Sequence, residues 1–194
     1  MGYWVVKNKY YLDYRPDVMY NPMFPELFEN KKLIGLRTLS DIGKLRFIFD
    51  TEDLYCNDSV VIVMQWFRLE KVTNNTIRRF ISAEKVKTSR NYSYELLQGI
   101  LNSKLIRFYF NELMYDGTHF YPNHMKSLPI ALINETLHDV TSRIEELVIE
   151  ARNLNASNTN RSNDGVSKNI DELVYQLYEL TPEEIDIIAG SISR

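Results

Sequence analysis

The spacing of the apolar residues changes near residue 92, and this change constrains the fold more than any other feature of the sequence. Upstream, short runs of β-branched and aromatic residues are separated by turn residues: Leu33–Leu39, Leu45–Asp50 and Ser59–Arg68. Such runs are typical of strands. Downstream, apolar residues recur every three or four positions, which is the period of an amphipathic helix. The sequence therefore predicts a mixed α/β chain of the α+β class, with a twisted, mostly antiparallel sheet followed by packing helices.

Two features of the strand region give specific predictions. Val60–Met64 is almost continuously apolar, which predicts a strand buried on both faces. Thr73–Thr76 is polar and lies between the runs Trp66–Val72 and Ile77–Ile81. This arrangement predicts a hairpin turn that joins two further strands.

A first helix is predicted from Ser93 to about Phe110. Ser93 is a suitable N-cap, and Glu95 in the first turn favours the same start. A polar and aromatic loop, residues 115–124, and a short extended segment, Ser127–Ile130, are expected to follow. The apolar residues of the predicted helix share one face: Leu97, Ile100, Leu101, Leu105 and Phe108.

A second long helix is predicted from about Asn134 to Asn153, followed by a helical tail. Its seam resembles that of a coiled coil and consists of Leu137, Val140, Ile144, Leu147, Ala151 and Leu154. The tail has an apolar helical face made of Ile170, Leu173, Val174, Leu177 and Tyr178. Thr181–Glu184 then predicts a short helix with an N-cap, a proline in the first turn and a capping-box glutamate.

Composition places the chain among globular proteins and narrows its compartment. Its 194 residues are 44% hydrophobic and 25% charged. No apolar run approaches the length of a membrane span, and the N-terminus lacks a signal-peptide layout. Cys56 is the only cysteine, which excludes an internal disulfide and favours a reducing cytoplasm. Met1–Trp4 begins abruptly in an apolar segment, so we expect the chain to be a piece of a longer protein.

Charge is distributed unevenly along the chain. Residues 1–131 hold 18 Lys and Arg against 14 Asp and Glu, whereas residues 132–194 hold 5 against 12. A basic body with an acidic tail is able to meet DNA phosphates with the body. Random scatter of charge over a solvated surface is the alternative, and the sequence leaves it open.

The stretch Asp17–Arg37 contains two apparent enzyme signatures. Asn21-Pro22-Met23-Phe24 is similar to a damaged Asn-Pro-Pro-aromatic motif, by which amino-methyltransferases hold a target base. A self-contained methyltransferase also needs a glycine-rich cofactor turn and a βαβ alternation. No Gly-x-Gly occurs here and that alternation is missing, so we do not expect this activity in the chain.

The second signature is a loose nuclease pattern, Pro16-Asp17 followed by Glu29-Asn30-Lys31. Pro22 and Pro25 lie between the two acids and oppose the hairpin that would bring them together. His119 and His124 are better explained as ordinary loop histidines, because zinc prefers four ligands and Cys56 is remote in the sequence. We therefore predict neither a catalytic residue nor a metal ligand.

With catalysis and metal binding not expected, the remaining chemistry in the sequence is that of ligand binding. Arg and Lys side chains contact phosphates or guanine, and Asn pairs with adenine. We expect fewer than half of the candidates to contact DNA. The candidate DNA-binding residues are Lys31, Lys32, Arg37, Lys44, Arg46, Arg78, Arg79, Lys85, Lys87, Arg90, Tyr115, His119, Tyr121 and Asn123.

Four segments occur in the order seen in the TaqI-like C-terminal specificity domains of N6-adenine DNA methyltransferases and type II restriction–modification enzymes. They are "LFENKKLIGLR", "FDTEDLYCNDSVVIVM", "YELLQGILNSKLIRFYFNELM" and "GTHFYPNHMKSLPI". The tail "IDELVYQLYELTPEEIDIIAG" also resembles the ending of many such enzymes. The resemblance covers residues 24–130 and 169–190.

This resemblance implies a target recognition domain for double-stranded DNA. The parent's catalytic domain would be a separate N-terminal part that carries S-adenosylmethionine, with Mg²⁺ if the parent also cleaves DNA. This chain would hold no cofactor and catalyse nothing by itself. The implied division is a recognition domain at 1–131, a coiled-coil-like helical arm at 132–154, a flexible linker at 155–168 and a helical tail at 169–194.

One alternative function stays open at this stage. The chain could be a non-catalytic protein-interaction or structural module whose basic face is incidental. The apolar seam of the second long helix is likewise open to two interpretations. It packs either on a neighbouring domain or in the chain's own core.

Overall fold

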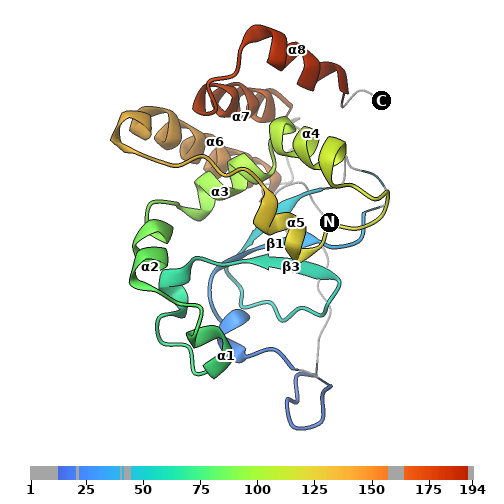
Figure 1. Ribbon diagram of the computed structural model, residues 1–194, viewed down its shortest axis with the longest axis vertical. Coiled ribbons are helices and arrows are strands. Elements are labelled where there is room, and N and C mark those ends of the chain that lie inside the picture. Colours follow the sequence, from blue (N-terminus) through green and yellow to red (C-terminus); the bar gives the residue numbers. More distant parts are fainter. Residues whose placement is uncertain (1–12, 21, 40, 42–44, 157–163, 192–194) are drawn as a thin grey trace.

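The computed structural model describes residues 13–20, 22–39, 41, 45–156 and 164–191. Its described part is an α+β fold in which helices pack on a three-stranded antiparallel sheet of order β2-β1-β3 (Figure 1). The strands are β1 (Lys32–Leu36), β2 (Phe47–Asp50) and β3 (Val60–Val63). The predicted fold class and antiparallel sheet are confirmed.

The central strand β1 is the most buried of the three, and a glycine sets its fit to β2. Leu33 and Ile34 are buried and pair with Phe49 and Ile48 across the sheet. A Cβ atom on Gly35 would lie 2.7 Å from the ring of Phe47. Only glycine therefore lets that ring lie over β1 without displacement.

The prediction for the run Val60–Met64 was wrong about burial. β3 is an edge strand of the sheet, and only Val61 of its four residues is buried. A continuous apolar run indicates a strand but does not distinguish a central strand from an edge strand. The strand with the most buried residues is the central strand β1, where four of the five residues are buried.

The predicted hairpin at residues 66–81 was wrong, because this region is helical. It contains η3 (Trp66–Leu69) and α1 (Asn75–Arg78), followed by α2 (Ala83–Ser89). Asn74 caps α1 by accepting hydrogen bonds from the N–H groups of Thr76 and Ile77. The polar residues interpreted as a turn therefore act as a helix start, the position where asparagine is most favoured.

The predicted helix from Ser93 to Phe110 is divided into α3 (Tyr94–Leu101) and α4 (Lys104–Leu113). Ser93 caps α3 as predicted, accepting a hydrogen bond from the N–H of Leu96. The break follows from Asn102, whose side chain bonds both the N–H and the C=O of Phe47. A second cap, Ser103, then starts α4. Tertiary bonding by Asn102 overrides the continuous helical period.

The long helix and the tail form as predicted, with shifted ends. η4 (Glu135–Leu137) leads into α6 (His138–Ala156), and α7 (Asp164–Leu177) and α8 (Pro182–Ser191) follow. α7 begins inside the predicted linker, whose residues 157–163 lie outside the described residues. The capping box at the start of α8 is confirmed: Thr181 and Glu184 exchange side-chain and backbone hydrogen bonds.

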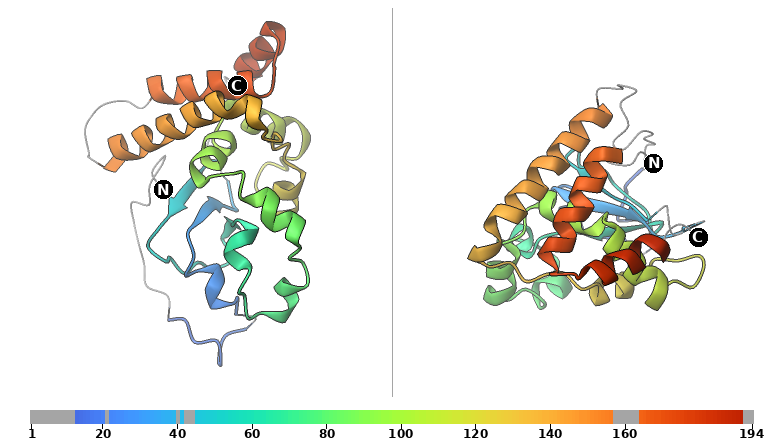
Figure 2. Two further views of the ribbon diagram at one scale, coloured as in Figure 1. Left: turned by 90° about the vertical axis from the view of Figure 1, so that its left-hand side faces the viewer. Right: turned by 90° about the horizontal axis from the view of Figure 1, so that it is seen from above.

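α6 packs between α3 and α7, above the sheet (Figure 2). Ile144, Leu147 and Ala151 of the predicted seam are buried there. A Cβ atom on Gly99 of α3 would lie 2.6 Å from Ile144, so the glycine allows the two helices to approach closely. The buried residues of this seam therefore pack within the chain's own core.

One hydrophobic core extends from Leu33 in β1 to Ile188 in α8. The predicted recognition segment, arm and tail all contribute side chains to it, and their boundaries stay a prediction about the parent protein. A smaller cluster beneath η3 contains Phe24, Leu69 and Val72. No helix in the described ranges is both long and apolar enough to cross a membrane.

Candidate nucleic-acid interface

Lys32 was predicted to contact DNA, and the structure contradicts this. Its side chain is fully buried, and its ammonium group bonds the carboxylate of Asp50 and, at 2.5 Å, the carbonyl of Phe28. Asp50 also accepts the N–H groups of Glu52 and Leu54. Buried charges persist when they are paired and hydrogen-bonded. Lys31, one residue earlier, is exposed.

The strand-end group consists of Arg37, Tyr115, His119, Tyr121 and Asn123. The backbone brings it together: the N–H of Leu39 donates to Thr118 at 2.7 Å, and the N–H of Phe120 donates to Arg37 at 2.7 Å. The loop after α4 is thereby attached to the end of β1, although some 80 residues separate the two segments in the sequence.

Within the strand-end group, aromatic rings and a guanidinium lie together at the surface. The rings of His119 and Tyr121 stack with centroids 5.2 Å apart, and the guanidinium of Arg37 lies 5.5 Å from the Tyr121 centroid. Tyr115 donates to the carbonyl of Gly117, and Asn123 is exposed at the start of α5 (Pro122–Ser127). The predicted loop residues therefore cluster with Arg37, although part of the predicted loop is helical.

Asp116 fixes the loop that carries His119. Its carboxylate accepts the N–H groups of His119 at 2.7 Å and of Thr118 at 2.9 Å. These hydrogen bonds lower the pKa of Asp116, because they stabilise its charged form. Gly117 follows with φ +91°, a conformation that favours glycine. His119 is thus held in place by its own backbone.

The ring of His124 lies edge-to-face on the ring of Tyr121, with centroids 5.2 Å apart. Its Nδ1 accepts the N–H of Tyr121 at 3.1 Å, and its ring packs against Phe110 and Phe120.

Within the described ranges, no group of three or more His, Cys, Asp or Glu residues could hold a metal ion. Neither Asp17 nor Glu29 belongs to such a group, and Glu29 instead accepts the hydroxyl of Tyr55 at 2.7 Å. That hydrogen bond raises the pKa of Tyr55 to about 12.

The basic segment comprises residues 66–90, that is η3, α1 and α2 with their connections, at the periphery of the fold (Figure 1). Arg78 and Arg79 are exposed at the end of α1. Lys85 lies over the Trp66 ring at 5.0 Å, which keeps its charged group at the surface. The remaining predicted cations of the segment, Lys87 and Arg90, are also exposed.

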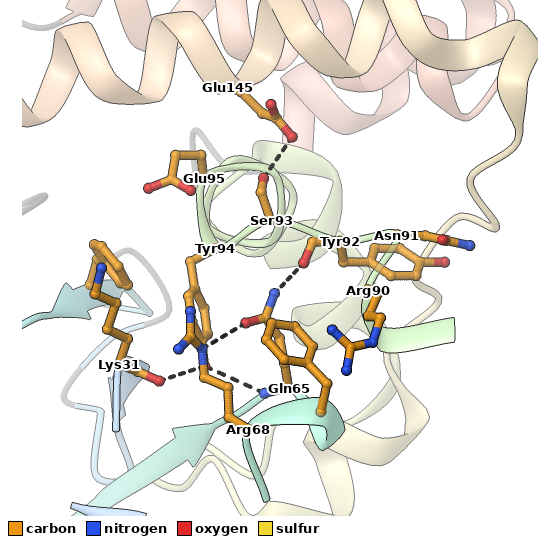
Figure 3. A pocket seen from close by; sticks show the side chains of 12 residues that line it. Lys31, Gln65, Arg68, Arg90, Asn91, Tyr92, Ser93, Tyr94, Glu95 and Glu145 are labelled. Carbon is orange, nitrogen blue, oxygen red and sulfur yellow. Dashed lines mark hydrogen bonds between the residues drawn. The ribbon is translucent and has the colours of Figure 1, made fainter. Parts of the chain in front are cut away.

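A polar pocket of about 540 Å³ lies between the basic segment and α6 (Figure 3). Lys31, Arg68 and Arg90 bring three cations to it from three separate parts of the chain. Arg68 and Arg90 both lie against the ring of Phe67, at 5.1 and 4.8 Å from its centroid. The other lining residues are Phe49, Gln65, Asn91, Tyr92, Ser93, Tyr94, Glu95 and Glu145.

Hydrogen bonds hold the base of the polar pocket. The Gln65 amide donates to the carbonyl of Tyr92 and accepts from Nε of Arg68 at 3.2 Å. The buried Tyr94 hydroxyl donates to the carbonyl of Lys31 at 2.5 Å (Figure 3). Burial raises the pKa of Tyr94, and the nearby N–H of Gln65 and the Arg68 guanidinium oppose that rise. The three cations thus surround a fixed polar base.

The opposite wall of the pocket is acidic. The Ser93 hydroxyl donates to Glu145 of α6 at 2.6 Å. Glu95 pairs with Arg152 at 2.5 Å, and Arg152 also lies over the Phe49 ring at 4.2 Å. Burial lowers the pKa of Arg152, and Glu95 opposes this shift. Glu95 is therefore neutralised by its own partner, whereas Glu145 is bonded to a hydroxyl.

Arg46 and Lys44 complete the predicted set. Arg46 is half-buried near Asp171 of α7, and its guanidinium donates to the carbonyl of Leu45 at 2.6 Å. It belongs to neither the strand-end group nor the basic segment, so its predicted DNA contact finds no support in these clusters. Lys44 lies outside the described residues, as does Asn21 of the apparent methyltransferase motif.

The sequence interpretation missed several pocket residues, among them Arg68, Gln65 and Glu145. Arg68 was not among the candidate DNA-binding residues. The pocket depends on the tertiary placement of α6 beside the start of α3, and no spacing within the chain encodes that proximity.

No protein-family model matches this chain, and no curated protein or solved structure matches it. The resemblance to TaqI-like specificity domains therefore stays a prediction.

Proposed function

We propose that this chain is a double-stranded DNA recognition module. The observation that carries the proposal is the basic segment, where Arg78, Arg79, Lys85 and Lys87 are exposed on two short capped helices outside the main core. Exposed Arg and Lys side chains gain affinity for DNA by displacing the counterions of its phosphates. Such contacts orient a protein on the duplex without reading its sequence.

The strand-end group supplies chemistry suited to base edges. Arg37 donates through Nη1 to the carbonyl of Asp58 at 3.1 Å and has further N–H groups that can donate to guanine. Asn123 can pair with adenine. His119 and Tyr121 add hydrogen-bonding groups on a loop that Asp116 holds in place. A fixed loop loses little conformational entropy on binding. We therefore assign base reading to the strand-end group and phosphate contacts to the basic segment.

The resemblance found in the sequence extends this proposal to a parent enzyme. In it, a catalytic domain of the same protein would methylate adenine with S-adenosylmethionine, and this chain would select the site. The sheet described here is antiparallel and contains no βαβ unit, so this chain's described residues do not form a dinucleotide-type cofactor fold. The cofactor, the catalytic partner and a cytoplasmic location belong to the proposal for the parent.

The proposal is tested by titrating the chain with fluorescently labelled duplexes over a series of salt concentrations. We expect binding at ~50 mM salt, with an affinity that falls linearly on a logarithmic plot as salt rises. Absence of binding to every duplex of a random-sequence pool at that salt would contradict a self-sufficient DNA module. Enrichment of one sequence from the pool would identify the recognised site.

A protein-interaction module is the second candidate, and one observation favours it. A mainly apolar groove of about 640 Å³ lies beside β3, lined by residues such as Phe28, Val60 and Ile62. Exposed Tyr20 and Met23 lie at the same place, and contiguous apolar surface is typical of contact sites. Retention of all DNA binding after disruption of this groove by Ile62→Asp would separate the two functions.

A further inference from the structure

The polar pocket has an excess of cations on one wall. Arg90 has a carboxylate partner, Glu70, at 2.9 Å. Arg68 is hydrogen-bonded to the neutral amide of Gln65 and packs on two aromatic rings. Both guanidinium groups lie against the Phe67 ring, at 5.1 and 4.8 Å from its centroid. Arg68 thus has a neutral hydrogen-bond partner rather than a carboxylate, and an anion beside Arg68 and Lys31 would supply a counter-charge.

The arrangement suits phosphate better than carboxylate. Lys31 precedes β1, Arg68 lies in η3, and Arg90 follows α2, so the three donors approach the pocket from different segments (Figure 3). A planar carboxylate is satisfied by one guanidinium fork, whereas phosphate has several oxygens that accept from separate directions. The fixed base formed by Gln65 and Tyr94 holds Arg68 ready for such a ligand.

The acidic wall selects among phosphate ligands. Glu145 accepts a hydrogen bond from Ser93 and lines the same cavity; in Figure 3 its carboxylate points at Ser93, and the start of α3 lies between it and Arg68. An ionised carboxylate accepts hydrogen bonds at both oxygens, so Glu145 has capacity for a further donor. A ligand that bears a phosphate at one end and an amino group at the other would satisfy both walls.

We propose that the polar pocket binds a nucleotide whose phosphate contacts Lys31, Arg68 and Arg90 and whose exocyclic amino group donates to Glu145. The volume of about 540 Å³ lies within the range of roughly 300–1,000 Å³ usual for small-ligand sites. This chemistry is shared by a free mononucleotide and by an unpaired nucleotide of DNA. Only the second source rests on the proposed function.

The test measures binding of dAMP, dTMP and inorganic phosphate to the full chain by calorimetry. We expect dAMP to bind more tightly than dTMP, which lacks an exocyclic amino group, and more tightly than inorganic phosphate. Arg68→Gln should weaken dAMP binding roughly tenfold, since it removes a charge-assisted contact. Arg143→Gln, which changes an exposed cation of α6 outside the pocket, is the matched control and should leave dAMP binding unchanged.

Two further variants extend the test. One probes the phosphate contact without disturbing the fold, and the other probes the contact with the base. Lys31→Gln changes an exposed side chain, so it should fold normally and still weaken dAMP binding several-fold. Glu145→Ala, which removes the acceptor oxygens, should abolish the preference for dAMP over dTMP. The proposal would be overturned if none of the three ligands bound measurably. It would also be overturned if dAMP bound the Lys31→Gln and Arg68→Gln variants as tightly as the wild type.

Duplex DNA and a duplex with one unpaired adenine distinguish the two sources of nucleotide. If the pocket serves DNA, Lys31→Gln should remove any preference for the unpaired adenine. If it serves a free nucleotide, dAMP binds and the preference is absent. Binding of dAMP without any DNA binding would refute the proposed function alone, whereas DNA binding that depends on Arg78 but no dAMP binding would refute the pocket alone.

Discussion

The buried pair in the sheet and the basic segment place the same kind of side chain in opposite situations. Lys32 lies at 0% exposure and bonds to Asp50 at 2%, whereas Arg78 and Arg79 are exposed at the end of α1. A lysine at an inward position of a central strand becomes part of the core, because successive strand residues point to opposite faces. Cations on short helices outside the core stay available to a ligand.

The comparison teaches that a local excess of basic residues does not define a binding surface. Lys31 and Lys32 are adjacent and were given the same role from sequence, yet one lines the polar pocket and the other stabilises the sheet. Buried and exposed ion pairs also differ in how much they contribute to the free energy of unfolding. Breaking a buried ion pair costs about 3–5 kcal/mol, while an exposed pair contributes about 0–1 kcal/mol.

Lys32→Ala should have the largest effect on stability. It leaves the buried Asp50 carboxylate without its cation, and we expect a loss of about 3–5 kcal/mol in the free energy of unfolding. Denaturant titration followed by circular dichroism measures it. Lys31→Ala is the matched control and should change stability by less than about 0.5 kcal/mol. Equal effects of the two variants would remove the contrast between the buried and the exposed lysine.

The double variant Arg78→Glu/Arg79→Glu should have the largest effect on DNA binding. Two phosphate contacts become repulsive, so we expect affinity for every duplex to fall roughly tenfold or more and the salt dependence to become shallower by about two units. Fluorescence anisotropy over a salt series measures both. Arg143→Glu, on the exposed face of α6, should leave affinity nearly unchanged. An unaltered affinity of the double variant would exclude α1 from the interface.

Glu70→Gln tests the exposed side of the comparison. Its ion pair with Arg90 joins side chains that are 47% and 55% exposed, so the free energy of unfolding should change by less than about 1 kcal/mol. Removing the carboxylate leaves Arg90 freer to meet an anion, and dAMP binding should strengthen slightly. A stability loss as large as that of Lys32→Ala would show that this pair is structural.

Asp116 gives the smallest effect, a dependence on pH confined to one loop. Its pKa is lowered in the folded chain by the N–H groups of His119 and Thr118. The ionised carboxylate therefore favours the folded loop above the ordinary pKa, and this contribution is lost as pH falls through the lowered folded value. NMR should show the amide signals of both residues moving together at that pH. In the control variant Asp116→Asn, the amide signals of His119 and Thr118 should not move as pH falls. Wild-type signals that also stay fixed would contradict the role given to the Asp116 carboxylate.

Much of the fold is predictable from the sequence, and each failure has a local cause. The caps at Ser93 and Thr181 are readable because they depend only on neighbouring backbone groups. The split at Asn102 is not readable, since it depends on hydrogen bonds to Phe47 across the fold. The hairpin error arose because the polar cluster around Asn74 suits both a turn and a helix cap.

The candidate site is less predictable than the fold. The proximity of Arg37 to the 115–124 loop requires the backbone pairing of residues 37–39 with 118–120. The polar pocket needs α6 beside Ser93, a contact across 52 residues. The charge count showed that residues 1–131 are basic overall, but only tertiary structure separates exposed Arg78 from buried Lys32.

The most direct test of the DNA-recognition proposal is NMR mapping of backbone amides as a short duplex is added to the ¹⁵N-labelled chain. We expect the shifted signals to concentrate in the basic segment (residues 66–90) and around the strand-end group (Arg37 and residues 115–123), with little change in α7 and α8. Shifts confined to α6, α7 and α8, or none at ~50 mM salt where phosphate contacts are strong, would contradict it.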